Sequence, residues 1–96
     1  MPEIEIYTQP WCGFCARAVA LLSKKGVAYR EIDAPAGSPA REEAVRRSGG
    51  RTTVPQIFIS GTHVGGCDDL YALEHERYSS GKPVYGIAGK MGVGKL

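Results

Sequence analysis

The hydrophobic pattern at the start of the chain changes from a period of two to a helical period. Residues 3–8, Glu-Ile-Glu-Ile-Tyr-Thr, alternate polar and apolar side chains, which predicts a strand. After a break that contains a proline, Cys15, Val19 and Leu22 recur at helical spacing and share one face. Gly26 is typical of a helix end, so the pattern predicts a strand followed by a helix.

The rest of the pattern predicts three more strands and two more helices. They are a strand at 27–32, a helix that starts with Ser38 and Pro39, strands at 53–59 and 62–64, and a helix capped by Asp68 or Asp69. The order is therefore β-α-β-α-β-β-α. A β-α-β unit is normally right-handed and parallel, and a two-residue turn makes an antiparallel hairpin. We expect an α/β fold with a four-stranded mixed sheet flanked by helices.

Length and composition limit the chain to one ordinary domain. It has 96 residues, 43% hydrophobic and 23% charged. Residues 1–81 carry nine Lys or Arg and ten Asp or Glu, whereas residues 82–96 carry three Lys and no acid. We assign the domain to residues 1–81, and residues 82–96 to a Gly/Lys-rich C-terminal extension of unknown role. The domain has no basic surplus, so we expect no nucleic-acid partner.

The lengths of the apolar runs and the N-terminal pattern bear on whether the protein is expected in a membrane or in the cytoplasm. The longest is Ala18-Val19-Ala20-Leu21-Leu22, and a membrane span needs roughly 20 apolar residues. The acidic, alternating N-terminal segment has no signal or transit pattern. We therefore expect no membrane association and a cytoplasmic protein.

The three cysteines carry the main chemical signal. Cys12 and Cys15 form a C-x-x-C pair and Cys67 stands alone, which does not fit a dense extracellular disulfide framework. Cys12 follows a predicted strand and opens a predicted helix, where free N–H groups and the helix dipole stabilise a thiolate. We therefore predict that Cys12 is a nucleophile. Cys15, one turn further on the apolar face, is predicted to be more buried and less reactive.

Two alternatives remain for the cysteine pair. Both thiols could be inert helix residues, although C-x-x-C after the first strand of a β-α-β pattern favours redox chemistry. The pair could also bind zinc. The other candidate ligands, His63, Cys67 and His75, do not form a usual second ligand pair.

Three motifs together resemble the glutaredoxins, of the small bacterial dithiol type with a C-G-F-C active site. They are Ile6-Tyr7-Thr8 leading to Cys12-Gly13-Phe14-Cys15, Thr53-Val54-Pro55-Gln56-Ile57-Phe58-Ile59, and Gly65-Gly66-Cys67-Asp68-Asp69-Leu70. The resemblance covers residues 3 to about 76. It implies a thioredoxin-like fold, catalysis by Cys12 and Cys15, and glutathione as co-substrate.

The resemblance also implies a set of glutathione-binding residues. They are Gln9, Phe14, Thr53, Val54, Pro55, Gly66, Cys67 and Asp68. In the family the proline is cis and lies beside the reactive cysteine, and the backbone of the residue before it pairs with glutathione as an added strand. N–H groups at the helix start would bind the γ-glutamyl carboxylate and Asp68 its ammonium; the alternative is that Asp68 is a plain helix cap.

Two positions depart from the family pattern. Gln9 stands where relatives often have lysine, which removes a charge near the glycyl carboxylate of glutathione, and Arg41 is a candidate substitute. Phe14 stands where tyrosine is frequent, so the ligand loses a hydroxyl neighbour. Tyr7 and Trp11 are interpreted as packing residues, and Cys67 as a small buried residue.

The resemblance favours a glutathione-dependent thiol–disulfide oxidoreductase. Its expected partners are glutathione and glutathionylated or disulfide-containing proteins, and the expected state is a monomer. The alternative is a [2Fe–2S] carrier, a dimer ligated by Cys12 of each chain and two glutathiones, for which Gly13 leaves more room than the proline of many relatives. A thioredoxin-like protein reduced by a flavoenzyme is a weaker third interpretation.

Overall fold

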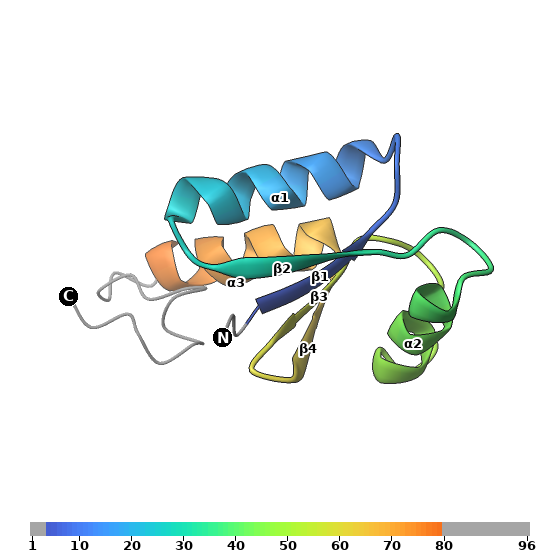
Figure 1. Cartoon of the computed structure of the whole chain (residues 1–96). Helices are drawn as coiled ribbons and strands as arrows, with labels where there is room; N and C mark the ends of the chain where they lie inside the picture. Colours follow the sequence, from blue (N-terminus) through green and yellow to red (C-terminus); the bar gives the residue numbers. More distant parts are fainter. Residues whose placement is uncertain (1–3, 80–96) are drawn as a thin grey trace.

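The computed structural model describes residues 4–79, so the extension assigned to residues 82–96 lies outside them. Seven elements follow the expected β-α-β-α-β-β-α order (Figure 1). They are β1 (Ile4–Thr8), α1 (Gly13–Lys25), β2 (Tyr29–Asp33), α2 (Pro39–Arg47), β3 (Gln56–Ile59), β4 (Thr62–Gly65) and α3 (Cys67–Ser79).

The strands form one mixed four-stranded sheet in the order β2-β1-β3-β4. β1 runs parallel to β2 and antiparallel to β3, with Tyr7 opposite Gln56, and β3 and β4 form the hairpin. The expected α/β fold with a mixed sheet is therefore confirmed, and its order is that of a thioredoxin-like fold.

Helices cover both faces of the sheet, and each face has its own core. Because side chains alternate along a strand, Ile4 and Ile6 face one side and Tyr7 the other. The first core lies under α1 and α3, which lie side by side in Figure 1. It contains Ile4, Ile6, Ala18, Leu22, Ile57, Ile59, Cys67 and Leu70. The second lies under α2 and contains Tyr7, Ala34, Ala44 and Phe58.

A polar network fastens α2 to its face of the sheet. Arg47 donates from Nη2 to Glu5 Oε1 at 2.9 Å and from Nη1 to the Tyr7 hydroxyl at 2.8 Å. The Tyr7 hydroxyl donates to Glu43 Oε1 at 3.0 Å, and the Arg47 guanidinium lies 4.1 Å from the Phe58 ring centre. The second core is thus closed by hydrogen bonds at the sheet–helix junction.

Several element boundaries differ from the sequence prediction, and three of them bear on the site or its sheet. β3 starts at Gln56 rather than residue 53, because Pro55 has no N–H to give a strand ladder. β2 starts at Tyr29 rather than residue 27. α3 starts at Cys67, so Asp69 is its third residue and accepts the Gly66 N–H at 2.9 Å, which leaves Asp68 without the capping role. Within residues 4–79 no helix is both long and apolar enough to cross a membrane.

Candidate active site

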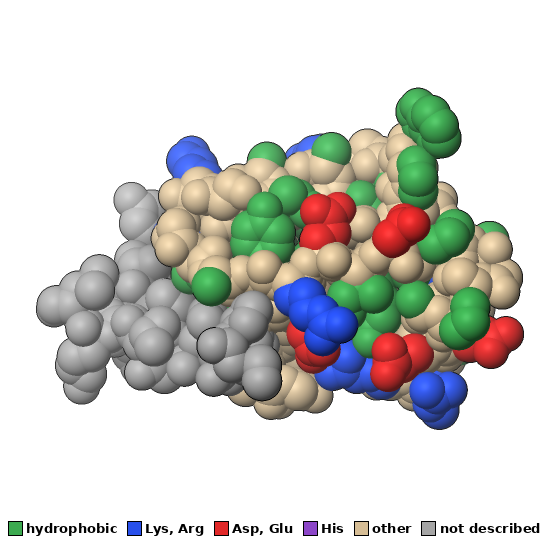
Figure 2. Space-filling view, in the orientation of Figure 1, with side chains coloured by type: hydrophobic (Ala, Val, Ile, Leu, Met, Phe, Trp, Pro, Cys, Tyr) green, Lys and Arg blue, Asp and Glu red, His purple; other side chains and the backbone are tan. Residues whose placement is uncertain are grey.

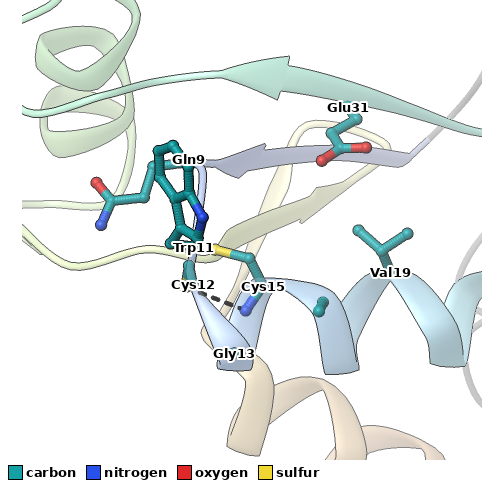
Figure 3. Close-up of a pocket in the computed structure, with 8 residues that line it drawn as sticks. Gln9, Trp11, Cys12, Gly13, Cys15, Val19 and Glu31 are labelled. Atoms are coloured by element: carbon teal, nitrogen blue, oxygen red, sulfur yellow. Dashed lines mark hydrogen bonds between the residues drawn. The ribbon is translucent and has the colours of Figure 1, made fainter.

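Cys12 is the N-cap of α1, directly after the break that ends β1. Its backbone is extended, with φ −109° and ψ 108°, and its Sγ accepts the N–H of Cys15 at 3.2 Å (Figure 3). The side chain is half-buried. A sulfur held by a helix N-terminal N–H is the arrangement that stabilises a thiolate, so the geometry agrees with the predicted nucleophile.

Cys15 lies one turn further, on the buried face of α1. Only 3% of its surface is exposed. Burial raises the pKa of the Cys15 thiol well above its ordinary value, and the hydrogen bond and charge of Cys12 add to the rise. The predicted burial of Cys15 is confirmed, and this environment favours the neutral thiol.

Trp11 is not the packing residue that the sequence predicted. Its side chain is 100% exposed, and its φ is +55°, in the left-handed region that favours glycine. The chain turns here between Pro10 and Cys12, and this backbone carries the indole away from the core. Hydrophobic side chains protrude at this end of the molecule in Figure 2. Tyr7 is fully buried, so its predicted packing role is confirmed.

Two clefts lie near Cys12, which lines the first and is a neighbour of Val54 in the second. The Trp11 cleft, of about 530 Å³, is drawn in Figure 3, with Glu31 entering it from β2. It is lined by Gln9, Trp11, Cys12, Gly13, Cys15, Ala16, Val19 and Glu31. The Pro55 cleft, of about 440 Å³, lies beside the start of β3 and of α3. It is lined by Phe14, Arg51, Thr53, Val54, Pro55, Gly66, Cys67, Asp68 and Asp69.

The Pro55 cleft gathers seven of the eight residues that the resemblance assigned to glutathione. The Val54–Pro55 peptide bond is cis, as the resemblance implied. The Cys12 thiol lies 3.9 Å from the Val54 carbonyl oxygen, to which it can donate, so this loop and the predicted nucleophile are neighbours. Phe14 is 57% exposed at the edge of the cleft.

The start of α3 presents free backbone donors to the Pro55 cleft. The first intrahelical bond runs from the Leu70 N–H to the Gly66 oxygen at 3.0 Å, so the N–H groups of Cys67 and Asp68 precede the helix ladder. Gly65 has φ +126°, and a Cβ there would lie 2.3 Å from Asp69 Oδ2, so only glycine fits beside this cap.

Sequence reasoning missed two charged residues of the Pro55 cleft, Arg51 and Asp69. Arg51 Nη2 lies 3.6 Å from Asp69 Oδ2. The position of Arg51 directly before the Thr52-Thr53-Val54-Pro55 segment is the one signal that points to it. The sequence indicates Asp69 only as a candidate helix cap.

Gln9 is the one assigned residue that the structure does not bring to the Pro55 cleft; it lines the Trp11 cleft instead. Its Oε1 accepts a hydrogen bond from Arg41 Nη1 at 3.0 Å. Arg41 also donates to the backbone oxygens of Ala34, at 2.6 Å, and Thr52, at 3.2 Å. The guanidinium is therefore held beside Gln9, the position for which Arg41 is the candidate substitute cation.

Cys67 is a buried residue at the start of α3, with 5% of its surface exposed. Burial raises the pKa of its thiol above the ordinary value. Among the residues that the structure describes, no three His, Cys, Asp or Glu side chains lie close enough to hold a metal ion. His63 makes a hydrogen bond to Gln56 instead.

Solved structures similar to this chain include a solution structure of glutaredoxin from Brucella melitensis. It is 52% identical, with a TM-score of 0.70, and the match covers 100% of this chain and 95% of that one. A buckwheat glutaredoxin–glutathione complex is 26% identical, with a TM-score of 0.69, over 95% and 80% of the two chains. A structure described as metal binding of glutaredoxins is 51% identical, with a TM-score of 0.63, over 100% and 95%.

Sequence comparisons agree with the structural ones. The Glutaredoxin family model matches residues 4–64. Glutaredoxin 3 of Escherichia coli strain K12 is 57% identical over 74 residues, which are 77% of this chain and 88% of that protein. A glutaredoxin of Pseudomonas aeruginosa is 55% identical over 74 residues, 77% and 87% of the two proteins. The chain therefore belongs to the glutaredoxin family, of the bacterial type, and is a thiol–disulfide oxidoreductase.

Proposed function

We propose that this glutaredoxin reduces protein–glutathione mixed disulfides and protein disulfides with glutathione, through Cys12 and Cys15. One observation carries the proposal: Cys12 Sγ accepts a helix N-terminal N–H at 3.2 Å and lies 3.9 Å from the Val54 oxygen, at the loop that lines the Pro55 cleft. The nucleophile therefore has a binding cleft next to it.

In the monothiol route, the Cys12 thiolate attacks the glutathionyl sulfur of a protein–glutathione disulfide. The bond between the two sulfurs breaks, a Cys12–glutathione disulfide forms, and the protein leaves as a thiolate that takes up a proton. The thiolate of a second glutathione then attacks the glutathionyl sulfur, which releases oxidised glutathione and restores the Cys12 thiolate.

In the dithiol route, Cys12 first forms a mixed disulfide with one sulfur of a protein disulfide. Cys15 loses its proton and attacks the sulfur of Cys12, which frees the second protein thiol and leaves a Cys12–Cys15 disulfide. Two glutathiones reduce this disulfide and become oxidised glutathione. When glutathione already occupies Cys12, we expect attack by Cys15 to be slower than attack by a second glutathione, because Cys15 is buried and its thiol is neutral.

We assign glutathione to the Pro55 cleft. Its cysteinyl backbone pairs with the backbone of Val54, and its γ-glutamyl carboxylate meets the free N–H groups of Cys67 and Asp68. The carboxylate of Asp68 is exposed at this point and takes the ligand ammonium. The buckwheat glutaredoxin–glutathione complex, a similar fold, supports a ligand of this class.

The glycyl carboxylate of glutathione needs another partner, because Gln9 is neutral. Arg41 supplies a positive charge held against Gln9 Oε1 at 3.0 Å, and we propose Arg41 and Gln9 together for this end of the ligand. The chemistry depends on a reduced glutathione pool, so we also propose a cytoplasmic location and glutathionylated or disulfide-containing proteins as partners.

A [2Fe–2S] carrier is the second candidate, and two observations favour it. A Cβ at Gly13 would meet nothing within 4 Å, so the space next to Cys12 is open, and the structure described as metal binding of glutaredoxins is 51% identical. One chain offers no group of three metal-binding side chains among its described residues. We propose the dimer in which each chain contributes Cys12 and each of two glutathiones a thiolate.

Alkylation at pH 6 should separate the two cysteines. Iodoacetamide reacts with thiolates, so we expect it to label Cys12 at least about tenfold faster than Cys15, whose pKa is raised by burial. Tandem mass spectrometry of the tryptic peptide 1–17, which holds both cysteines, measures the two rates. Faster labelling of Cys15 would reverse the proposed roles.

Single serine variants test the two routes. Cys12→Ser should abolish all thiol transfer, because no nucleophile remains at the N-terminus of α1. Cys15→Ser should keep glutathione-driven deglutathionylation and lose reduction of a protein disulfide. The two activities are measured with a glutathionylated peptide and a disulfide-containing protein, with folding checked by circular dichroism. Turnover with a flavoenzyme reductase in place of glutathione would contradict the proposed glutathione dependence.

Asp68→Asn tests the ammonium contact. We expect the apparent affinity for glutathione to fall about tenfold, or about 1.4 kcal/mol, because a charge-assisted hydrogen bond is lost. The alkylation rate of Cys12 should stay the same. Glu42→Gln, the same change of charge on the exposed surface of α2, is the matched control. Equal affinities of Asp68→Asn and Glu42→Gln would remove Asp68 from the binding site.

Anaerobic reconstitution with iron, sulfide and glutathione tests the second candidate. We expect a dimer with visible absorbance and one [2Fe–2S] cluster per two chains. Gly13 is the first residue of α1, where proline is accommodated, so Gly13→Pro should fold, lower the iron content and keep deglutathionylation. No iron uptake by the unmodified chain with glutathione present would eliminate the carrier function and leave the oxidoreductase proposal intact.

A further inference from the structure

Gln56, the first residue of β3, is a fully buried polar side chain. Its exposed fraction is 0%, in a strand whose other residues are apolar. Its Nε2 donates to the Thr53 oxygen at 3.1 Å and lies 3.4 Å from Thr53 Oγ1. Its Oε1 lies 2.7 Å from His63 Nε2 on β4. The buried amide thus connects β4 to the loop before Pro55.

The direction of each of these hydrogen bonds follows from the first one. The Thr53 backbone oxygen can only accept, so the amide nitrogen of Gln56 faces it and the amide oxygen faces His63. His63 Nε2 therefore carries a proton and donates it to Gln56. The His63 ring also lies 5.0 Å from the Phe58 ring, centre to centre, which fixes the ring on the sheet.

This chain of hydrogen bonds fixes one peptide plane of the Pro55 loop. The Thr53–Val54 peptide is trans, so its N–H points opposite to its C=O. Gln56 holds the carbonyl toward the buried side, and the Val54 N–H must point the other way. Val54 lines the Pro55 cleft, and within residues 4–79 the structure records no hydrogen bond from this N–H.

We propose that Gln56, held by His63, is a positioning residue that aims the Val54 N–H at the cysteinyl carbonyl of glutathione. The inference rests on the proposed pairing of glutathione with Val54. Gln56 and His63 do not touch the ligand; they act through the orientation of one peptide group. His63 prevents rotation of the Gln56 amide, so each of the two residues matters for the same contact.

A purely structural role for Gln56 is a weaker account of the same observations. A buried amide costs free energy unless every polar atom is paired, and an apolar side chain of similar size would fill the space without that requirement. The other three residues of β3, Ile57, Phe58 and Ile59, are of that apolar kind. The amide stands at the first position of the strand, where it reaches the Thr53 carbonyl.

The test measures the stability of two mixed disulfides on Cys12. Both are formed in full-length Cys15→Ser protein, where no second active-site thiol can displace the adduct. In the first, Cys12 exchanges with oxidised glutathione to give the Cys12–glutathione disulfide and one glutathione. In the second, Cys12 exchanges in the same way with the disulfide of 2-mercaptoethanol, which has no backbone to pair with Val54. Intact-mass spectrometry gives both equilibrium constants.

Gln56→Leu should lower the glutathione constant about fivefold, the effect of one lost hydrogen bond, and leave the 2-mercaptoethanol constant unchanged. His63→Phe keeps the aromatic contact with Phe58 and removes the donor to Gln56, so a smaller fall of the glutathione constant alone is expected. His63 is only partly buried, and its variant carries the test if Gln56→Leu fails to fold.

Two results would overturn the inference. Unchanged constants for both adducts would show that the Val54 N–H keeps its direction without Gln56. An equal fall of both constants would show that the substitution disturbs Cys12 itself rather than glutathione pairing. Failure of the proposed function is a different result, since Cys15→Ser protein would then bind glutathione no more tightly than 2-mercaptoethanol before any change at Gln56.

Discussion

The antiparallel pairing of β1 with β3 is the constraint on which the active site depends. Tyr7 lies opposite Gln56, so the C-terminal end of β1 and the N-terminal end of β3 meet at one edge of the sheet. The chain leaves β1 toward Cys12 and enters β3 through the Val54–Pro55 loop. β4 runs back to the same edge, and α3 therefore begins there as well. Cys12, the Val54–Pro55 loop and the start of α3 are neighbours because of strand direction.

The same geometry gives the two cysteine side chains of the C-x-x-C pair different environments. Cys12 lies before the first turn of α1, where its sulfur accepts a hydrogen bond from the Cys15 N–H, which has no backbone partner within the helix. Cys15 stands one turn later on the face that packs against the sheet, and burial raises the pKa of its thiol. We propose that this spacing of three residues separates a reactive thiol, Cys12, from a reserve thiol, Cys15.

Much of this arrangement could be predicted from the sequence, because it depends on local patterns. Hydrophobic periods predicted the element order, and the C-x-x-C position predicted that Cys12 starts the first helix and that Cys15 is buried. The contacts made by long or charged side chains were harder to predict. Local spacing does not show that Arg41 reaches Gln9, or that Asp69 rather than Asp68 accepts the Gly66 N–H. The prediction that Trp11 packs in the core was wrong for a related reason. Its side chain is exposed at a residue with positive φ, and no sequence pattern at that position indicated this backbone conformation.

Recognition by backbone groups explains which side chains matter around the Pro55 cleft. The donors proposed for glutathione belong to Val54, Cys67 and Asp68, and a backbone N–H is present whatever the side chain. What the sequence must supply is the direction of each peptide plane. Asp69 accepts the Gly66 N–H at the start of α3, and Gln56 holds the Thr53 carbonyl before Pro55, which we propose orients the Val54 N–H. Part of the proposed specificity for the ligand therefore lies in Gln56, which is buried behind the cleft and orients a donor without contacting glutathione.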